Sequence, residues 1–384
     1  MIGSDQSVSE FLDTVETFSS NEIMPAAAKW NKGGAPAPEL FKKAAELGLS
    51  RLAVTKENGG LGFDFSVKAK ACEILAAADF GFAMSLVNTL NVAIKIAQCS
   101  SASLKTEYLP ALLWGQASAC TALTEQVAGS DFSAIQTRAK KEGDRWILDG
   151  EKIWITNARN ASLAVVYAQT GGPGERTAIQ SFLVDLTAPG CRRYAISSAF
   201  SQASTGTGGL VFSHCEIPDN HLLSSPEGAF KSIMSEINGA RIYVAAMCCG
   251  MLGAAIKHAI TYGLKRHSFG QPLMDHQSWR FALAQAETDL AVSRNFVFSA
   301  AEQIDQDKDT QLISAQAKIQ AVNTCQKHIP VLLHSMGAEG LREEYPFARH
   351  LAASRIAALV DGSTEMLLER VSKLSHLTKS TSKQ

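Results

Sequence analysis

The sequence predicts an α+β fold in three parts: a helical N-terminal domain over residues 1–116, a middle β domain over residues 117–224 and a C-terminal helical bundle over residues 225–384. Two observations predict this order. Apolar residues recur at helical spacing in the first and last parts, whereas the middle part consists of short apolar runs separated by turn residues. The chain has 384 residues, which is more than one hydrophobic core usually holds.

The N-terminal part follows the helical period. One apolar series with this spacing is made of Phe11, Val15, Phe18 and Ile23. The glycine-rich segment at 57–62 lacks the preceding strand and following helix of a phosphate-binding loop. We therefore expect it to connect two helices.

The middle part has the pattern of short strands. Apolar runs occur at 145–149, 163–167 and 179–184. The turn signal at 142–145, with alternating runs on both sides, predicts a hairpin. A last run, at 210–218, ends in a proline, which stops a strand. This part is expected to form a small β-sheet domain or β-barrel.

The C-terminal part returns to the helical period in long segments. They cover residues 233–263, 277–304 and 312–336, and each is long enough for a helix of a bundle. The polar segment at 305–309 is expected to be a loop between two of them.

Composition narrows the class of protein. The 36 basic and 37 acidic residues give a net charge of −1, which argues against a nucleic-acid or anionic-membrane partner. No apolar run is expected to be long enough to span a membrane. The first residues lack the basic and apolar regions of a secretory signal. The eight cysteines form no Cys-x-x-Cys pair and no metal-ligand spacing with histidine, so we expect no metal and a cytoplasmic, reducing location.

Two segments, 123–131 and 152–157, carry the chemistry. The first is a turn of small residues rich in hydroxyl groups, and the second is expected to be a strand with Trp154 and Thr156 on one face. An aromatic face beside backbone N–H groups and hydroxyls suits a planar hydrogen-bonding ring system such as a flavin. The alternative is an ordinary β-hairpin with a buried tryptophan.

Together with two further motifs, these segments resemble the acyl-CoA dehydrogenase family of flavoproteins along nearly the whole chain. The four motifs are Thr124-Glu125 with Ala128-Gly129-Ser130-Asp131; Trp154-x-Thr156-Asn157; Arg266-x-x-Phe269-Gly270 with His276-Gln277; and Gly337-x-x-Gly340 ahead of Asp361-Gly362-Ser363-Thr364-Glu365. The resemblance implies a helical N-terminal domain, a middle β domain and a C-terminal four-helix bundle. It also implies FAD bound between the β domain and the bundle.

The resemblance assigns residues to this cofactor and implies a homo-oligomer, a dimer or tetramer. The implied FAD contacts are Thr124 and Thr156 at the isoalloxazine edge, Ser130 at its pyrimidine side, Trp154 on the ring, Arg266, Phe269 and Gln277 at the pyrophosphate and adenine of FAD in a neighbouring subunit, and His334, Gly337 and Ser363. Arginine side chains match pyrophosphate oxygens. Without the motif, Arg266 and Gln277 would be interpreted as a solvated helix face.

The resemblance also implies a substrate and a reaction. The substrate is an acyl thioester, usually of coenzyme A, which loses an α-proton to a base and a β-hydride to flavin N5. The electrons then pass to an electron-transfer flavoprotein. The family base is usually a glutamate just before Gly-Thr, and here that position is Asp361. Arg241 would hold Asp361 ionised or oriented, and Ser130, Arg241 and Gly362 would contact the substrate.

Aspartate at this position is a departure from the family. Its side chain is shorter than that of glutamate by one C–C bond, roughly 1.5 Å. Some members carry the base just before an arginine matching Arg241, but here that residue is Ala240. Glu365, one helical turn on, is a weaker candidate. The alternatives are that Asp361 caps the following helix and that Arg241 makes an interhelical salt bridge.

Other departures mark a divergent member. His334 replaces a glutamine, Ala338 a glycine, residues 126–127 a Pro-Gly pair and Thr121 an aromatic residue. Three alternative functions therefore stay open: a flavin-dependent hydroxylase or oxidase of the same fold, a dehydrogenase of acyl groups on a carrier protein, and a non-catalytic partner subunit. A nucleic-acid-binding relative is disfavoured by the near-zero net charge.

Overall fold

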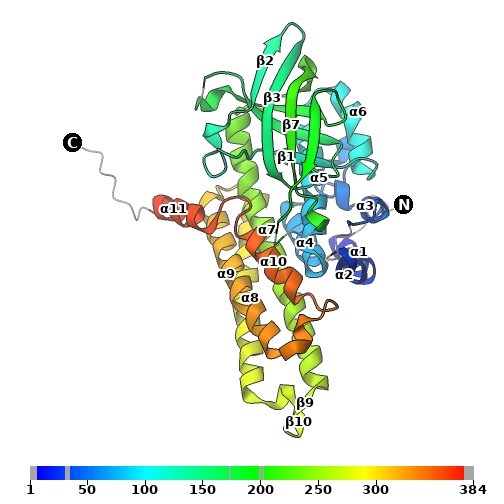
Figure 1. The fold of residues 1–384 in the computed structure, drawn as a ribbon, viewed down its shortest axis with the longest axis vertical. Helices are drawn as coiled ribbons and strands as arrows, with labels where there is room; N and C mark the ends of the chain where they lie inside the picture. The colour runs from blue at the N-terminus through cyan, green and yellow to red at the C-terminus, as the bar shows by residue number, and fades with distance from the viewer. Residues whose placement is uncertain (1–6, 31–34, 173, 199, 201–202, 376–384) are drawn as a thin grey trace, which may run out of the picture. The chain divides into compact units, whose positions relative to one another are not determined.

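The computed structural model describes residues 7–30, 35–172, 174–198, 200 and 203–375 (Figure 1). The chain forms two compact units that are each built from separate stretches of sequence. The first contains Met1–Thr14, Gly33–Asp64 and Gly81–Ser235, and the second contains Val15–Lys32, Phe65–Phe80 and Glu236–Gln384.

Helices of the first unit form where the sequence places helix-start signals. They are α1 (Val8–Phe18, in this unit up to Thr14), α3 (Pro38–Glu46), α5 (Phe80–Cys99, in this unit from Gly81) and α6 (Ala102–Leu113). Ser7 and Glu10 form a capping box, since the Ser7 N–H donates to Glu10 Oε2 at 3.0 Å and the Glu10 N–H donates to Ser7 Oγ at 3.3 Å. The glycine-rich segment at 57–62 is a turn after a short 3₁₀ helix (Lys56–Asn58), as predicted.

The β-sheet also lies in the first unit, and its strands are visible in Figure 1. The strands are β1 (Ala119–Ala122), β2 (Arg138–Glu142), β3 (Arg145–Ile155), β4 (Leu163–Gln169), β5 (Ile179–Asp185), β6 (Cys191–Ala195), β7 (Gly208–Pro218) and β8 (Leu222–Leu223). Their order is β6-β7-β3-β2-β4-β5-β8, with β1 parallel to β4. The predicted hairpin is confirmed, because β2 and β3 pair antiparallel from Glu142 and Arg145.

The strand predicted over 152–157 is shorter than expected. Strand β3 ends at Ile155, and its pairing with β7 is irregular between Lys152 and Ile155. Trp154 has φ +61°, in the left-handed region. The simple alternation that would place Trp154 and Thr156 on one strand face therefore does not apply, since a kinked backbone sets the direction of the indole.

The second unit is helical. Its helices are α2 (Met24–Trp30), α4 (Phe65–Ala78), α7 (Ala229–Lys265, in this unit from Glu236), α8 (Gln277–Asp305), α9 (Gln311–Ser335), α10 (Phe347–Ala357) and α11 (Thr364–Leu374). The polar segment at 305–309 separates α8 from α9, as predicted. A two-stranded hairpin, β9 (His267–Ser268) with β10 (Gln271–Pro272), connects α7 to α8.

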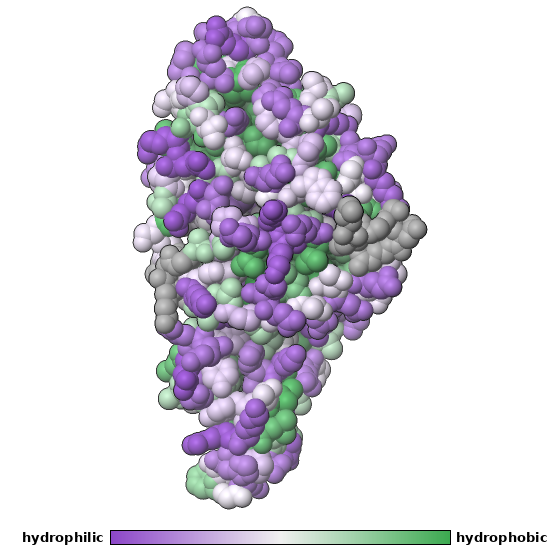
Figure 2. Space-filling view, turned by 90° about the vertical axis from the view of Figure 1, so that its right-hand side faces the viewer, coloured by the Kyte–Doolittle hydropathy of each residue, from purple (hydrophilic) through white to green (hydrophobic). Residues whose placement is uncertain are grey.

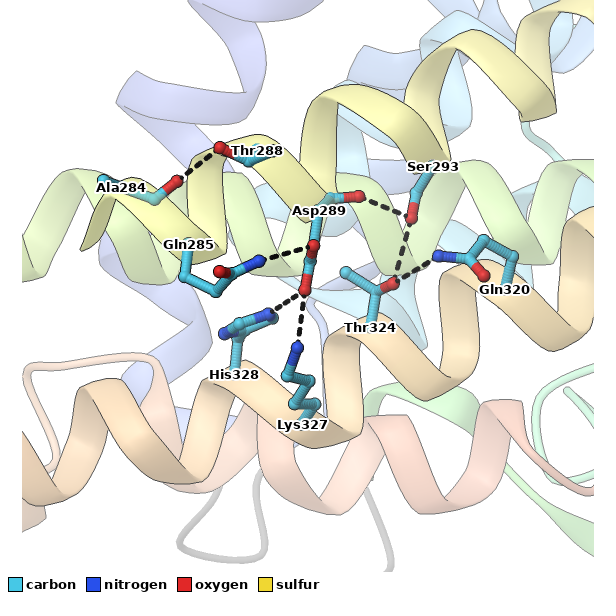
Figure 3. Close-up of polar contacts among 9 residues, drawn as sticks. All are labelled: Ala284, Gln285, Thr288, Asp289, Ser293, Gln320, Thr324, Lys327 and His328. Carbon is cyan, nitrogen blue, oxygen red and sulfur yellow. Dashed lines mark hydrogen bonds and ion pairs between the residues drawn. The ribbon is translucent and has the colours of Figure 1, made fainter. Parts of the chain in front are cut away.

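A polar cluster joins α8 to α9 (Figure 3). Asp289 on α8 lies 2.8 Å from Lys327 Nζ and 2.7 Å from His328 Nε2, both on α9. The Ser293 hydroxyl donates to Thr324 Oγ1 at 3.1 Å. These contacts fix which faces of the two helices meet, because each side chain finds its partner only in this register.

Two helices are apolar and long enough to cross a membrane by length and composition, namely α5 and α7. The sequence prediction that no such segment exists was therefore too strict. In the most apolar window of each helix, 83% and 94% of the residues are buried inside the protein, which is typical of core helices. Figure 2 shows hydrophilic residues spread across the visible face, with hydrophobic residues in smaller groups among them.

Candidate active site

The hydroxyl-rich turn of the first unit follows strand β1. Hydrogen bonds from Glu125 N–H to Ala128 O at 2.9 Å and from Ala128 N–H to Glu125 O at 3.2 Å close it. The Ile153 N–H donates to Thr124 O at 2.9 Å, which attaches the turn to the end of β3. The two segments predicted to work together are thus neighbours.

A buried ion pair lies beneath them. Lys152 Nζ is 2.8 Å from Glu125 Oε1 and also donates to Leu123 O at 3.0 Å. The other donors to the Glu125 carboxylate are the N–H groups of Gln136 at 2.6 Å and Thr137 at 3.0 Å. Burial lowers the pKa of Lys152 to about 8, with Glu125 opposing this. Burial alone would raise the pKa of Glu125, but Lys152 and the hydrogen bonds lower it, so both groups are charged at pH 7.

The surface above this pair fits a planar, hydrogen-bonding ligand. Trp154 is 54% exposed despite its size. The hydroxyls of Thr124, Ser130 and Thr156 make no hydrogen bond with any other residue described in the structure. The following residue, Asn157, is buried and anchors the segment, because its N–H donates to Thr205 O at 2.8 Å. An exposed indole beside available hydroxyls is what an isoalloxazine ring requires.

The second unit holds the candidate base. Asp361 lies between α10 and α11 with φ +55°, in the left-handed region. Lys318 Nζ donates to the carbonyl oxygens of Val360 and, at 2.7 Å, of Gly362. Arg241 Nε donates to the carbonyl oxygen of Asp361 at 3.1 Å. Two buried cations therefore bind three consecutive carbonyls of the loop that carries Asp361.

The charges of Lys318 and Arg241 also affect the ionisation of the Asp361 carboxyl group. Burial raises the pKa of Asp361, and Lys318 and Arg241 oppose the rise. Burial lowers the pKa of Lys318 to about 8 and that of Arg241 to about 10. A carboxylate with a raised pKa is a stronger base, and two adjacent cations keep it ionised at higher proton concentration.

The structure decides between several sequence interpretations. Ser363, not Asp361, is the N-cap of α11, since its hydroxyl accepts from the Met366 N–H at 3.4 Å. Arg241 binds the backbone of Asp361 and the side chain of Asn238, at 2.8 Å, so the interhelical salt bridge is not formed with Asp361. Glu365 is exposed.

The residues assigned to the distal part of the cofactor lie at the ends of the long helices. Arg266, Phe269 and Gln277 are exposed around the β9–β10 hairpin, and Phe269 is 96% exposed at its tip. Phe269 and Gly270 have φ of +50° and +80°, as a tight two-residue hairpin turn requires. His334 is exposed in the last turn of α9. Gly337 follows that helix with φ +62°.

Sequence reasoning did not identify Lys318 or the Lys152–Glu125 pair. A signal existed for Lys318, because it interrupts the apolar stripe formed on α9 by Ala321, Val322 and Cys325 and is itself buried. A lysine in such a stripe needs partners. No pattern in the sequence pointed to the carbonyls at 360 and 362. Among the residues that the structure describes, no cluster of three or more potential metal ligands occurs.

Comparisons with known proteins agree with this arrangement. Three sequence profiles match in order: the acyl-CoA dehydrogenase N-terminal domain over residues 5–116, the middle domain over 120–215 and the C-terminal domain over 228–375. The chain belongs to the acyl-CoA dehydrogenase family.

Individual relatives cover almost the whole chain. The mitochondrial short-chain specific acyl-CoA dehydrogenase of Homo sapiens is 32% identical over 371 residues, which cover 96% of this chain and 89% of that protein. The structure of butyryl-CoA dehydrogenase from Megasphaera elsdenii matches with a TM-score of 0.91 and 29% identity, covering 98% of this chain and 100% of that one. A glutaryl-CoA dehydrogenase from Mycobacterium smegmatis, in complex with FADH2, matches with a TM-score of 0.91 and 26% identity, covering 98% and 96%.

Proposed function

We propose that this protein is a FAD-dependent dehydrogenase that introduces an α,β double bond into an acyl thioester, with Asp361 as the base. The observation that carries the proposal is the loop around Asp361. Its three carbonyls are bound by Lys318 and Arg241, so the backbone of the only carboxylate at a family base position is held in place. A base has to be fixed relative to the proton that it removes.

The carboxylate of Asp361 accepts the α-proton in this proposal. Its raised pKa increases its proton affinity, and the nearby charges of Lys318 and Arg241 keep it ionised before the reaction. Gly362, in the same loop, and Arg241, which binds that loop, would position the thioester. Aspartate supplies the carboxylate that proton removal needs, although its side chain is one methylene group shorter than that of glutamate.

FAD supplies the redox chemistry by accepting the β-hydride. On the first unit, Trp154 would pack on its ring, Thr124 and Thr156 would donate to its edge, and Ser130 would lie at its pyrimidine side. The ion pair of Lys152 and Glu125 would keep these residues in place. Arg266, Phe269, Gln277, His334, Gly337 and Ser363 are assigned to the rest of the cofactor.

Substrate, acceptor and assembly complete the proposal. The proposed substrate is a short-chain acyl-CoA, which is supported by the similarity to the human short-chain specific acyl-CoA dehydrogenase and to the Megasphaera elsdenii butyryl-CoA dehydrogenase. Electrons taken from the substrate have to leave again, and an electron-transfer flavoprotein is the proposed acceptor. The exposed Phe269 at the hairpin tip supports a homo-oligomer, because a phenyl ring that is 96% exposed gains by being covered. The eight free cysteines support a reducing, cytoplasmic location.

The test is an anaerobic titration of the FAD-loaded protein with short, medium and branched acyl-CoA thioesters, followed by bleaching of the flavin absorbance. We expect bleaching by short-chain substrates. It should be lost in Asp361→Asn, with the FAD content unchanged. The matched control is Glu365→Gln, which neutralises an exposed carboxylate four residues away and should bleach normally.

The other outcomes separate the alternatives. If bleaching were lost in Glu365→Gln and retained in Asp361→Asn, the base would be Glu365. No bleaching by any CoA ester, with FAD bound, would contradict the proposal and favour a carrier-bound substrate, a hydroxylase or oxidase, or a non-catalytic subunit. Rapid reoxidation by oxygen would point to the oxidase or hydroxylase.

A further inference from the structure

Two cysteines of the first unit lie close together, outside the residues assigned to the flavin and the substrate. Cys191 begins strand β6, and Cys215 lies near the end of the neighbouring strand β7. Their Sγ atoms are 3.0 Å apart, and both thiols are free. A disulfide bond is about 2.05 Å long, so the sulfurs need to approach by only about 1 Å to form one.

The backbone of β7 explains why the two side chains meet. In the regular register Cys191 pairs with Phe212, three residues before Cys215. Between Phe212 and Cys215 the strand contains a bulge, in which His214 has φ +50° and its N–H donates to Asp149 Oδ1 at 2.7 Å. The bulge adds a residue to the alternation, so Phe212 and Cys215 both face the sheet core, against which Cys191 packs.

A glycine lets the strands approach closely at this point. The Ser213 N–H donates to Gly190 O at 2.9 Å. A Cβ on Gly190 would lie 2.6 Å from Ser213 O and 2.9 Å from the Cα of Cys215, so a larger residue would separate the strands here. The backbones that carry Cys191 and Cys215 are therefore held close together.

The two thiols differ in exposure. Cys215 is fully buried, whereas Cys191 is only partly buried at the margin of the core and is accessible to a small oxidant. A hydrogen bond from Cys191 lowers the pKa of Cys215, and the same contact raises the pKa of Cys191. An accessible thiol therefore lies beside a buried sulfur that can accept its proton and then resolve its mixed disulfide.

We propose that Cys191 and Cys215 form a redox-active dithiol that is oxidised by small disulfides such as glutathione disulfide. The Cys191 sulfur attacks the oxidant while its proton passes along the hydrogen bond to Cys215, which forms a mixed disulfide at Cys191 and releases one glutathione thiolate. Cys215 gives the proton up to that thiolate and attacks the Cys191 sulfur, which forms the protein disulfide and releases the second glutathione. Two electrons and two protons pass to the oxidant, which becomes two glutathione molecules.

A second cysteine pair provides an internal comparison. Cys325 on α9 is in hydrogen-bonding contact with Cys248 on α7, and both are fully buried. Proximity alone would make this pair react too. Because no oxidant can reach either sulfur in the folded protein, we expect it to stay reduced while Cys191 and Cys215 react.

The test is redox equilibration of the full-length, FAD-loaded protein in glutathione buffers, followed by acid quenching, alkylation of free thiols and peptide mapping. Under oxidising conditions we expect two fewer alkylated thiols than the eight in the chain, and one linked peptide that joins Cys191 to Cys215. Reduction should restore all eight. The melting temperature of the oxidised form should be higher, since the bond closes a loop in the unfolded chain.

Variants distinguish the mechanism from general thiol oxidation. Cys215→Ser should accumulate a glutathione adduct at Cys191, and Cys191→Ser should form neither the adduct nor the disulfide. The matched control is Cys99→Ser, which removes another partly buried cysteine and should leave the response unchanged. The proposal is overturned if all eight thiols are still free for alkylation after equilibration in the most oxidising buffer. It is also overturned if the wild-type protein stops at the glutathione adduct of Cys191, or if the linked peptide joins two other cysteines.

Discussion

Replacing Lys318 with methionine tests whether the loop around Asp361 is held for catalysis. The substitution keeps the length and apolar stem of the buried side chain but removes the ammonium that binds the carbonyls of Val360 and Gly362. A hydrogen bond from a charged group contributes about 1.5–3 kcal/mol. Val360 and Gly362 are only half-buried, so water can replace part of this, and we expect a loss of about 2–3 kcal/mol in the free energy of unfolding.

The larger effect should be on the rate. Asp361 has a left-handed backbone, which costs a non-glycine residue roughly 1–2 kcal/mol and tends to relax when its support is removed. A displacement of the carboxylate by about 1 Å is enough to slow proton removal by about 10²-fold. We therefore expect flavin reduction in Lys318→Met to be about 10²-fold slower at saturating acyl-CoA, with little change in FAD content.

The pH dependence of the reduction rate distinguishes an electrostatic role of Lys318 from a purely structural one. Asp361 must be ionised to accept a proton, so the reduction rate rises with pH through its raised pKa. Lys318 opposes that rise in pKa, and its removal should move the acid limb to higher pH. Because the pKa of Lys318 is about 8, its electrostatic contribution should fade above that pH, and the difference between wild type and variant should narrow there.

The assay is anaerobic stopped-flow measurement of flavin reduction from pH 5 to 9. The matched control is Lys68→Met, which removes another buried lysine with a pKa of about 8 in the same unit. The Lys68 ammonium lies 5.3 Å from the ring centre of Tyr243, whereas the charges that act on the pKa of Asp361 are those of Lys318 and Arg241. A wild-type rate and acid limb in folded, FAD-loaded Lys318→Met would refute the reasoning, as would an equal shift in the Lys68 variant.

Two further predictions concern the framework of each unit. Lys152→Met should lower the free energy of unfolding, measured by urea titration, by about 3–5 kcal/mol, because it leaves the buried carboxylate of Glu125 without its counter-charge. The double variant with Glu125→Gln should lose less stability than the sum of the two single variants. Asp289→Asn should cost about 1–2 kcal/mol at neutral pH. Lys327 and His328 lower the pKa of Asp289 to about 2. The difference in the free energy of unfolding between wild type and variant should therefore be complete above about pH 4, decline as the pH falls towards 2 and be absent below it. A stability difference that stays constant between about pH 2 and 6 would contradict this.

The fold was predictable because its signals are local. Helical spacing, the turn at 142–145 and the proline at 218 act within a few residues, and the elements formed where these signals occur. The direction of Trp154 was not predictable in the same way. The irregularity at the end of β3 arises from its pairing with β7, more than fifty residues further along the chain, and alternation within one strand carries no information about it.

In the candidate site, too, local motifs were predictable from the sequence and long-range contacts were not. Motifs identified Asp361 and Arg241, but the contact between Arg241 and the backbone of Asp361 joins residues 120 positions apart. Lys318 was visible only as an unexplained charge in an apolar stripe, since its acceptors are backbone carbonyls that any sequence would offer. Side-chain identity indicates that a partner is needed, and only the folded chain shows which atoms supply it.

The contacts of Lys318 and Arg241 with the loop at 360–362 limit how far Asp361 can compensate for its shorter side chain. An aspartate could reach as far as a glutamate if its backbone moved forward by about 1.5 Å. Here that movement is opposed, because Lys318 binds the carbonyls on both sides of Asp361 and Arg241 binds its own carbonyl. The carboxylate position is therefore set by the backbone. If Asp361 is the base, the α-carbon of the substrate has to come to the carboxylate, so the residues that bind the thioester, rather than the base itself, must compensate for the missing methylene group.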